Sequence, residues 1–73
     1  PNPTAGKLTV FLTENSEGSV ISVFDATGRV VQSASVQNAL RKDFDISALM
    51  NGVYVVKVQS RGNTYSQRVI LNK

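Results

Sequence analysis

Hydrophobic and polar residues alternate along most of this chain in short runs. In the first run, Leu8, Val10 and Leu12 alternate with Thr9 and Thr13. A period of two places successive side chains on opposite faces of a β-strand. The pattern predicts six strands, at residues 7–13, 19–24, 30–35, 40–46, 53–60 and 64–71. Short strands at near-regular spacing are typical of a sandwich or barrel, and a bulge in a longer run would add a seventh strand.

No stretch of the chain keeps the spacing of three and four residues that an amphipathic helix requires. The runs are instead rich in Val, Ile, Phe, Tyr and Thr, which favour strands. We therefore expect an all-β fold with at most one turn of helix.

Turn-forming residues separate the predicted strands. Asp25 can accept backbone hydrogen bonds, Ala26 and Thr27 fit right-handed positions, and Gly28 can supply the positive φ of a bulged hairpin. Residues 15–18 and 61–63 also end or centre on glycine and predict two further turns.

The segment between the fourth and fifth predicted strands has two interpretations. In the first, Ser47 is the N-cap of one helical or 3₁₀ turn, Leu49 plugs the open end of the core, and Asn51 with Gly52 forms a left-handed exit. In the second, the Asn-Gly pair forms a two-residue hairpin. We favour the first, because residues 48–50 would make a poor strand.

Length and composition predict one small domain over residues 1–73. A chain of 73 residues buries only roughly 60% of its unfolded surface, so its fold is viable but marginal. Hydrophobic residues make up 41% of the chain and are spread along it, which favours a folded domain over a disordered one. The absence of Cys and His excludes disulfides and the usual structural zinc sites.

The chain shows neither a membrane-spanning run nor a secretory signal. Its longest apolar run is far shorter than a bilayer span, so we expect no direct membrane insertion. It opens with Pro1, Asn2 and Pro3, without a basic region followed by an apolar one. This start predicts a fragment of a longer protein whose export signal lies upstream.

The net charge of +3 does not indicate a nucleic-acid partner. The basic residues are dispersed, and only Arg41 and Lys42 are neighbours. A surface that follows a phosphate backbone needs clustered cations with exposed aromatic residues between them. We interpret the basic residues as an ordinary solvated surface.

The residue types that catalysis usually requires are missing. Without His, a Ser or Thr nucleophile has no imidazole base. A serine with a lysine base is conceivable, but strands and turns account for every serine. We expect no enzyme, no catalytic residue and no cofactor.

Asp43 and Asp45 lie two residues apart and share one face of a predicted strand. Such a pair could bind calcium or act as acid and base. Calcium needs six or more oxygens, and no third carboxylate lies nearby in the sequence. We therefore interpret Asp43 as solvated, Asp45 as the cap of the following turn, and Asp25 as a turn residue.

The aromatic residues occur about once per predicted strand. A sugar-binding module would display some of them as a flat exposed platform, whereas a short domain needs them to fill its core. The chain has no Trp, which further disfavours sugar binding. A carbohydrate-binding or spacer module of an extracellular enzyme stays open as the alternative. The aromatic residues are Phe11, Phe24, Phe44, Tyr54 and Tyr65.

The last predicted strand runs to the end of the chain without a polar tail. It could merely complete a sheet. It could also be an edge that pairs with another protein, or with a second copy to form a homodimer, or a terminus whose carboxylate is captured. The residues alone leave these possibilities open.

Three motifs, in this order, resemble one family. They are PNPTAG at residues 1–6, FDATGRVV at 24–31 and FDISALMNGVY at 44–54. With the basic and apolar finish of the chain, they make its whole length similar to the C-terminal sorting domains of type IX secretion cargo from Bacteroidetes.

The resemblance implies a removable address. Family members adopt a compact Ig-like antiparallel β-sandwich, and their host crosses the inner membrane by an ordinary signal peptide. The outer-membrane translocon then recognises the C-terminal domain. A sortase-like peptidase commonly cuts upstream of it and joins the cargo to an anionic lipopolysaccharide. The implied route is therefore through the periplasm to the outer membrane, the cell surface or the medium.

The resemblance also assigns roles to residues. Recognition by the translocon or its shuttle falls on Arg68, Val69, Ile70, Leu71, Asn72 and Lys73. The motif residues that hold the fold are Pro1, Asn2, Pro3, Gly6, Asp25, Gly28, Gly52 and Tyr54. A rigid sandwich would present a terminal strand at low entropic cost. We expect loss of the last few residues to abolish export and to leave much of the fold intact.

Overall fold

The computed structural model describes residues 4–12, 18–36, 41–60 and 62–73, which form strands and no helix. The all-β prediction is confirmed, and each of the six predicted strands appears. Thr13 and Leu40, at two predicted strand ends, lie outside the described residues. In this part of the chain no helix is long and apolar enough to cross a membrane. The strands are β1 (Lys7–Phe11), β2 (Ser19–Phe24), β3 (Val30–Val36), β4 (Arg41–Asp45), β5 (Gly52–Ser60) and β6 (Asn63–Leu71).

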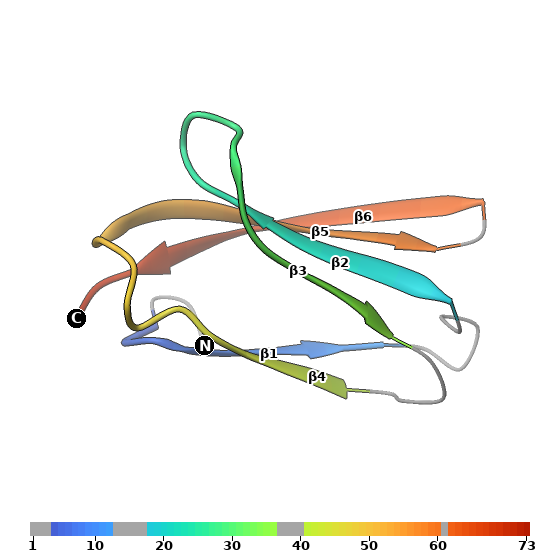
Figure 1. Cartoon of the computed structure of the whole chain (residues 1–73), viewed down its shortest axis with the longest axis horizontal. Helices are drawn as coiled ribbons and strands as arrows, with labels where there is room; N and C mark the ends of the chain where they lie inside the picture. The colour runs from blue at the N-terminus through green and yellow to red at the C-terminus, as the bar shows by residue number, and fades with distance from the viewer. Residues whose placement is uncertain (1–3, 13–17, 37–40, 61) are drawn as a thin grey trace.

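The strands form two antiparallel sheets packed as a sandwich (Figure 1). The small sheet pairs β1 with β4, and the large sheet has the order β3-β2-β5-β6. The chain changes sheet after β1, after β3 and after β4. The prediction of a compact Ig-like antiparallel sandwich is confirmed.

The core lies between the sheets and is built from the inward half of each alternating run. Ile21, Val23 and Leu71 are fully or almost fully buried. Burying such a side chain stabilises the fold by roughly 1.5–3 kcal/mol, which is large for a domain of this size. The buried hydrophobic residues are Leu8, Ile21, Val23, Val36, Phe44, Ile46, Tyr54, Val56, Val69 and Leu71.

The turn between β2 and β3 is the bulged hairpin that its sequence predicts. The Gly28 N–H donates to the Asp25 carbonyl at 3.0 Å, and the Asp25 N–H donates to the Arg29 carbonyl at 2.8 Å. Gly28 has a φ of 87°, which residues with a Cβ rarely adopt. The β2–β3 register shifts between Val23 and Phe24, as a bulge requires. Residues 15–17 and 61, in the other two predicted turns, lie outside the described residues.

The segment after β4 forms one turn, closed by a 3.0 Å bond from the Leu49 N–H to the Ile46 carbonyl. Leu49 packs against the core, which confirms it as a plug. The Asn-Gly hairpin is wrong, because β4 and β5 belong to different sheets. The N-cap at Ser47 is also wrong. Ser47 donates from its N–H and its hydroxyl to Asp45 Oδ1, so Asp45 caps the turn, as expected for that residue.

Candidate functional site

The terminal run, Arg68 to Lys73, is divided between the core and the surface. Val69 and Leu71 point into the sandwich and are almost completely buried. Arg68, Ile70 and Asn72 are exposed, with Ile70 at 39%. Val69 and Leu71 therefore belong to the fold and cannot meet a partner while it is intact. The expectation that the fold survives loss of the last residues must be revised, because such a deletion removes core.

The outer edge of β6 is covered at its end by the start of the chain. Thr4 forms a parallel bridge with Leu71. The Thr4 N–H donates to the Ile70 carbonyl at 2.9 Å, and the Asn72 N–H donates to the Thr4 carbonyl at 2.8 Å. Thr4 is itself buried, and its hydroxyl donates to the Lys7 carbonyl at 2.6 Å. The two ends of the domain are thus held side by side.

The turn between β4 and β5 holds the last residue. The Lys73 N–H donates to Asn51 Oδ1 at 3.0 Å. Lys73 Nζ donates to the carbonyls of Ser47 and Leu49 at 3.0 and 2.6 Å. We call the contacts that Thr4, Ser47, Leu49 and Asn51 make with residues 70–73 the terminal clamp. Because the clamp fixes the backbone of the terminal run, the exposed side chains of this run project in a fixed direction.

Gly6 allows the first segment to approach this turn closely. A Cβ on Gly6 would lie 2.7 Å from Ser47 Cβ, and the φ of Gly6 is 147°. The Gly6 carbonyl accepts a bond from the Ile46 N–H at 2.8 Å. Close backbone contact and positive φ both require glycine here.

Two other motif residues support the clamp from β5. Gly52 begins β5 and pairs with Leu71. Tyr54 is buried, and its hydroxyl donates to the Met50 carbonyl at 2.6 Å, which closes the loop that carries Asn51. Pro1, Asn2 and Pro3 lie outside the described residues, so their assignment stays a prediction.

Asp25 and Asp45 organise two turns in the same way. Hydrogen bonds from the Thr27 hydroxyl and the Arg29 backbone N–H lower the pKa of Asp25 to about 2. The Ser47 hydroxyl and N–H, followed by Lys7, lower the pKa of Asp45 well below its usual range. Both carboxylates therefore stabilise their turns in the ionised form.

Acid is expected to weaken the fold through these two turns. A carboxylate whose folded pKa is depressed contributes stability above its unfolded pKa and loses it as the pH falls through the folded value. The melting temperature should therefore decrease between about pH 4 and pH 2. Thermal unfolding at successive pH values tests this. In the double variant Asp25→Asn, Asp45→Asn the decrease should be smaller, and an unchanged decrease would contradict the assignment.

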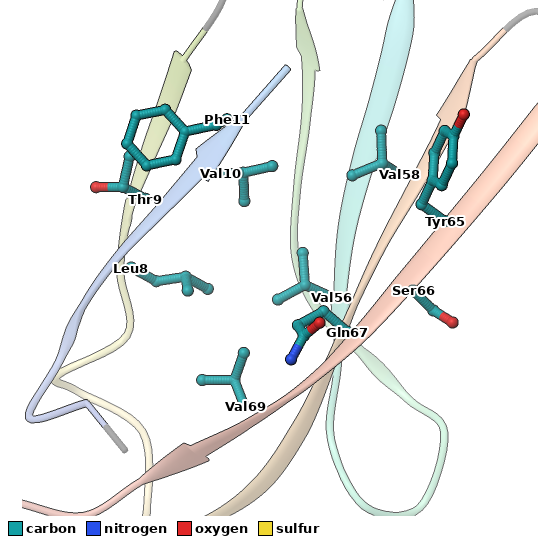
Figure 2. Close-up of a pocket in the computed structure, with 10 residues that line it drawn as sticks. All are labelled: Leu8, Thr9, Val10, Phe11, Val56, Val58, Tyr65, Ser66, Gln67 and Val69. Carbon is teal, nitrogen blue, oxygen red and sulfur yellow. The ribbon is translucent and has the colours of Figure 1, made fainter. Parts of the chain in front are cut away.

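An apolar groove opens beside the terminal strand. It lies between β1 and the β5–β6 pair and has a volume of about 360 Å³. Figure 2 shows Leu8 and Val10 on one side, Val56 and Val58 at the back, and Tyr65 on β6. Opposite it, the Gln32 side chain donates to the Asp45 carbonyl at 2.7 Å and joins β3 to β4. The sandwich is thus linked across one side and grooved on the other. The groove is lined by Leu8, Thr9, Val10, Phe11, Val56, Val58, Tyr65, Ser66, Gln67 and Val69, none of them charged.

No metal site is assembled in the described ranges, and the aromatic residues are divided, with Phe11 and Tyr65 exposed. Asp43 accepts a 2.8 Å bond from the Thr9 hydroxyl, and Asp45 is engaged with its turn. No group of three or more potential metal-binding side chains occurs there. Phe44 and Tyr54 are core residues. No observation favours the carbohydrate-binding alternative.

Comparison with known families identifies the family of this chain. A family model, described as the secretion system C-terminal sorting domain, matches residues 1–72. The chain belongs to this family. No curated protein gives a significant match to the chain.

The sorting domain is thus a C-terminal signal for type IX secretion, which directs export across the outer membrane to the cell surface or beyond. Its family is not a family of enzymes. Sequence reasoning named Gly6 as a residue that holds the fold and Lys73 as a recognition residue, but it did not assign Thr4 or Asn51 to holding the terminal strand. Thr4 lies within the PNPTAG motif, and Asn51 precedes a motif glycine. Their places within and beside the motifs were the sequence signal from which both residues could have been identified.

Proposed function

We propose that the type IX machinery reads the outward face of the terminal run, formed by Arg68, Ile70 and Asn72. The observation that carries this proposal is the alternation of the run. Val69 and Leu71 anchor it in the core, and the clamp fixes Lys73. The three exposed side chains are held in place before any partner arrives.

Two features of the outward face favour recognition, its rigidity and its composition. A preformed strand loses little conformational entropy on binding. Arginine is also enriched among the residues that anchor protein interfaces. Ile70 supplies apolar area, and Arg68 supplies charge and several hydrogen-bond donors.

Reporter export tests the proposal. In a reporter fused to the sorting domain, Ile70→Asp is expected to lower surface delivery by about tenfold, because a carboxylate would be desolvated at an apolar contact. Phe11→Asp is the matched control, since Phe11 is also an exposed apolar strand residue, at 78%, but lies on the small sheet. The control should deliver normally.

Thermal unfolding of both variants separates recognition from folding. Ile70 is partly exposed, so Ile70→Asp should retain a cooperative transition. Equal delivery by a folded Ile70→Asp variant and the control would overturn the proposal.

The machinery that would bind this face is an outer-membrane translocon or its shuttle, and a sortase-like peptidase would cut upstream of the domain. The parallel bridge between Thr4 and Leu71 supports this arrangement. A protein that holds the terminal strand would also hold the cargo junction nearby, where a peptidase could act.

A homodimer through the edge of β6 stays a prediction. In the described part of the chain, β6 has β5 as its only sheet neighbour, and Thr4 bridges only the end of its other edge. Part of β6 borders the groove, and sheet edges pair readily with another strand. Sedimentation at increasing protein concentration measures this pairing.

A further inference from the structure

The two sheets differ in width. In the described ranges the small sheet has two strands and the large sheet has four. The Gln32 side chain on β3 bonds to the Asp45 carbonyl, so β4 lies toward the β3 edge of the large sheet. β1 lies beside β4 and points Leu8 and Val10 into the groove (Figure 2). The groove therefore occupies the place that a third strand of the small sheet would take, over β5 and β6.

Part of the inner face of β6 is uncovered at this place. Tyr65, Gln67 and Val69 alternate with other residues of β6, so they share the face that meets the core. Val69 is buried, but Gln67 is exposed and Tyr65 is 62% exposed. Val58 on β5, which pairs with Tyr65, is only half-buried. These side chains point inward, yet no described strand of the small sheet covers them.

The edge of β1 that borders the groove carries backbone groups that point away from β4. The Gly6 carbonyl accepts a bond from the residue that follows β4, whereas the Lys7 carbonyl accepts the Thr4 hydroxyl on the other side. Successive backbone groups of a strand alternate in direction, so those of Thr9 and Phe11 also point away from β4. In the described part of the chain, β4 is the only strand that pairs with β1.

We propose that the groove is a binding site for an extended segment of a partner protein, which adds to β1 as the third strand of the small sheet. The backbone groups of Thr9 and Phe11 pair with the segment, because an open sheet edge binds extended peptides through main-chain hydrogen bonds. Alternate side chains of the segment enter the groove and cover Val58 and Tyr65. The site lies on the face of β6 opposite the outward face of the terminal run, so it goes beyond the proposed function and does not depend on it.

The lining of the groove specifies the chemistry of the segment. None of the lining residues is charged, and Lys7, at the start of β1, is paired with Asp45 at 3.0 Å. A charged side chain that entered the groove would lose its water without gaining an opposite charge. The segment that complements the groove therefore has apolar side chains at its inward positions and uncharged or polar ones at its outward positions.

Other occupants fit the groove less well. A small apolar molecule could contact the side chains but would leave the backbone edge of β1 unpaired. A second copy of the domain is hindered by its shape. In each copy β5 and β6 project beyond β1, and these strands would collide when two β1 edges meet.

Titration of the 73-residue domain with designed peptides tests the proposal. The probe is an uncharged, end-capped peptide of alternating valine and threonine, long enough to span β1. Two further versions carry backbone N-methyl groups on every valine or on every threonine. Because N–H groups alternate in direction along a strand, one version loses its donors to β1 and the other keeps them. We expect the first to bind at least about tenfold more weakly than the probe and the second to bind about as well.

Amide exchange tests which backbone groups the segment engages. In the free domain the amides of Leu8 and Val10, which face β4, should exchange slowly, and those of Thr9 and Phe11 rapidly. The probe should slow exchange at Thr9 and Phe11 by about tenfold or more and leave Leu8 and Val10 unchanged.

A variant tests the apolar lining. Tyr65→Asp should lower the affinity for the probe by about tenfold, because the segment would cover a carboxylate. Tyr65 is largely exposed, so the variant should keep a cooperative unfolding transition. Val30→Asp is the matched control, since Val30 is also an exposed apolar residue, at 51%, but lies on β3 at the opposite edge of the large sheet. Val30→Asp and Ile70→Asp should both bind the probe normally.

Four results would overturn the proposal. Equal binding of the two N-methylated versions would assign the groove to apolar molecules without strand pairing. Unchanged exchange at Thr9 and Phe11 would place the probe elsewhere, as would equal effects of Tyr65→Asp and Val30→Asp. Self-association without the probe, with slowed exchange at Thr9 and Phe11, would assign the edge of β1 to a second copy.

Discussion

Replacement of Leu71 by alanine is expected to destabilise the domain by about 3 kcal/mol. Leu71 is 1% exposed and is among the largest fully buried side chains. It lies near the end of the chain, where residues commonly fray, yet Gly52 on one side and Thr4 on the other pair with it. Its loss would leave a cavity that the paired backbone cannot easily collapse to fill.

Thermal unfolding measures this effect. For a domain of this size, 3 kcal/mol corresponds to a decrease in melting temperature of about 15 °C. Asn72→Ala is the control. The Asn72 side chain is exposed, and its removal leaves the hydrogen bond from the Asn72 N–H to the Thr4 carbonyl in place. A decrease of less than about 5 °C for Leu71→Ala would show that the end of β6 is not part of the cooperative fold.

This expectation changes how a C-terminal truncation should be interpreted. Deleting the last three residues removes Leu71 from the core together with the Lys73 contacts. A loss of export would then report unfolding as much as a missing signal. Substitutions at exposed positions such as Ile70 distinguish the two explanations.

Replacement of Gly6 by alanine is expected to destabilise the domain by about 2–3 kcal/mol. Its Cβ would lie 2.7 Å from Ser47 Cβ and 3.1 Å from Ser47 Cα, so a backbone segment would have to move. The segment that moves carries the Gly6 to Ile46 bond and the Ser47 carbonyl that accepts from Lys73. The substitution should therefore loosen the terminal clamp as well as strain φ.

Gly18→Ala isolates the contribution of the backbone angle. Gly18 also has a positive φ, at 78°, but a Cβ there would meet nothing within 4 Å. We expect about 1 kcal/mol for this control, from backbone strain alone. Amide exchange at Asn72 and Lys73 should accelerate in Gly6→Ala and not in Gly18→Ala. Equal effects of the two substitutions on melting temperature and exchange would argue against close packing at Gly6.

These predictions link the stability of the domain to its function as a signal. Small domains have stabilities at the low end of roughly 5–15 kcal/mol, so the loss of 3 kcal/mol is a large fraction. The clamp joins the first described segment, at Thr4, to the run proposed to be read. Loosening one end would therefore disturb the presentation of the other.

Much of the fold could be predicted from local sequence. Alternation predicts the strands because side chains on a strand repeat every two residues, and this holds whatever the partner strand is. The bulged hairpin was also predictable, since Asp25 and Gly28 satisfy that turn through contacts within five residues. The cap at Asp45 follows the same local logic.

Contacts between distant residues were beyond such local rules. One local prediction was also wrong: Ser47 was expected to accept a bond as an N-cap, but its hydroxyl donates to the Asp45 carboxylate two residues earlier. Sequence reasoning assigned recognition to the whole terminal run, because it could not tell which side of β6 would meet the other sheet.

The sequence by itself determined the all-β class, the strand positions, the main hairpin and, through its motifs, the family. Only the tertiary structure decided the sheet order, the terminal clamp and which side chains of the terminal run are buried. The reason is physical. Strand formation and turns depend on neighbours along the chain, whereas the pairing of Thr4 with Leu71, or of Lys57 with Ser66, depends on register between strands.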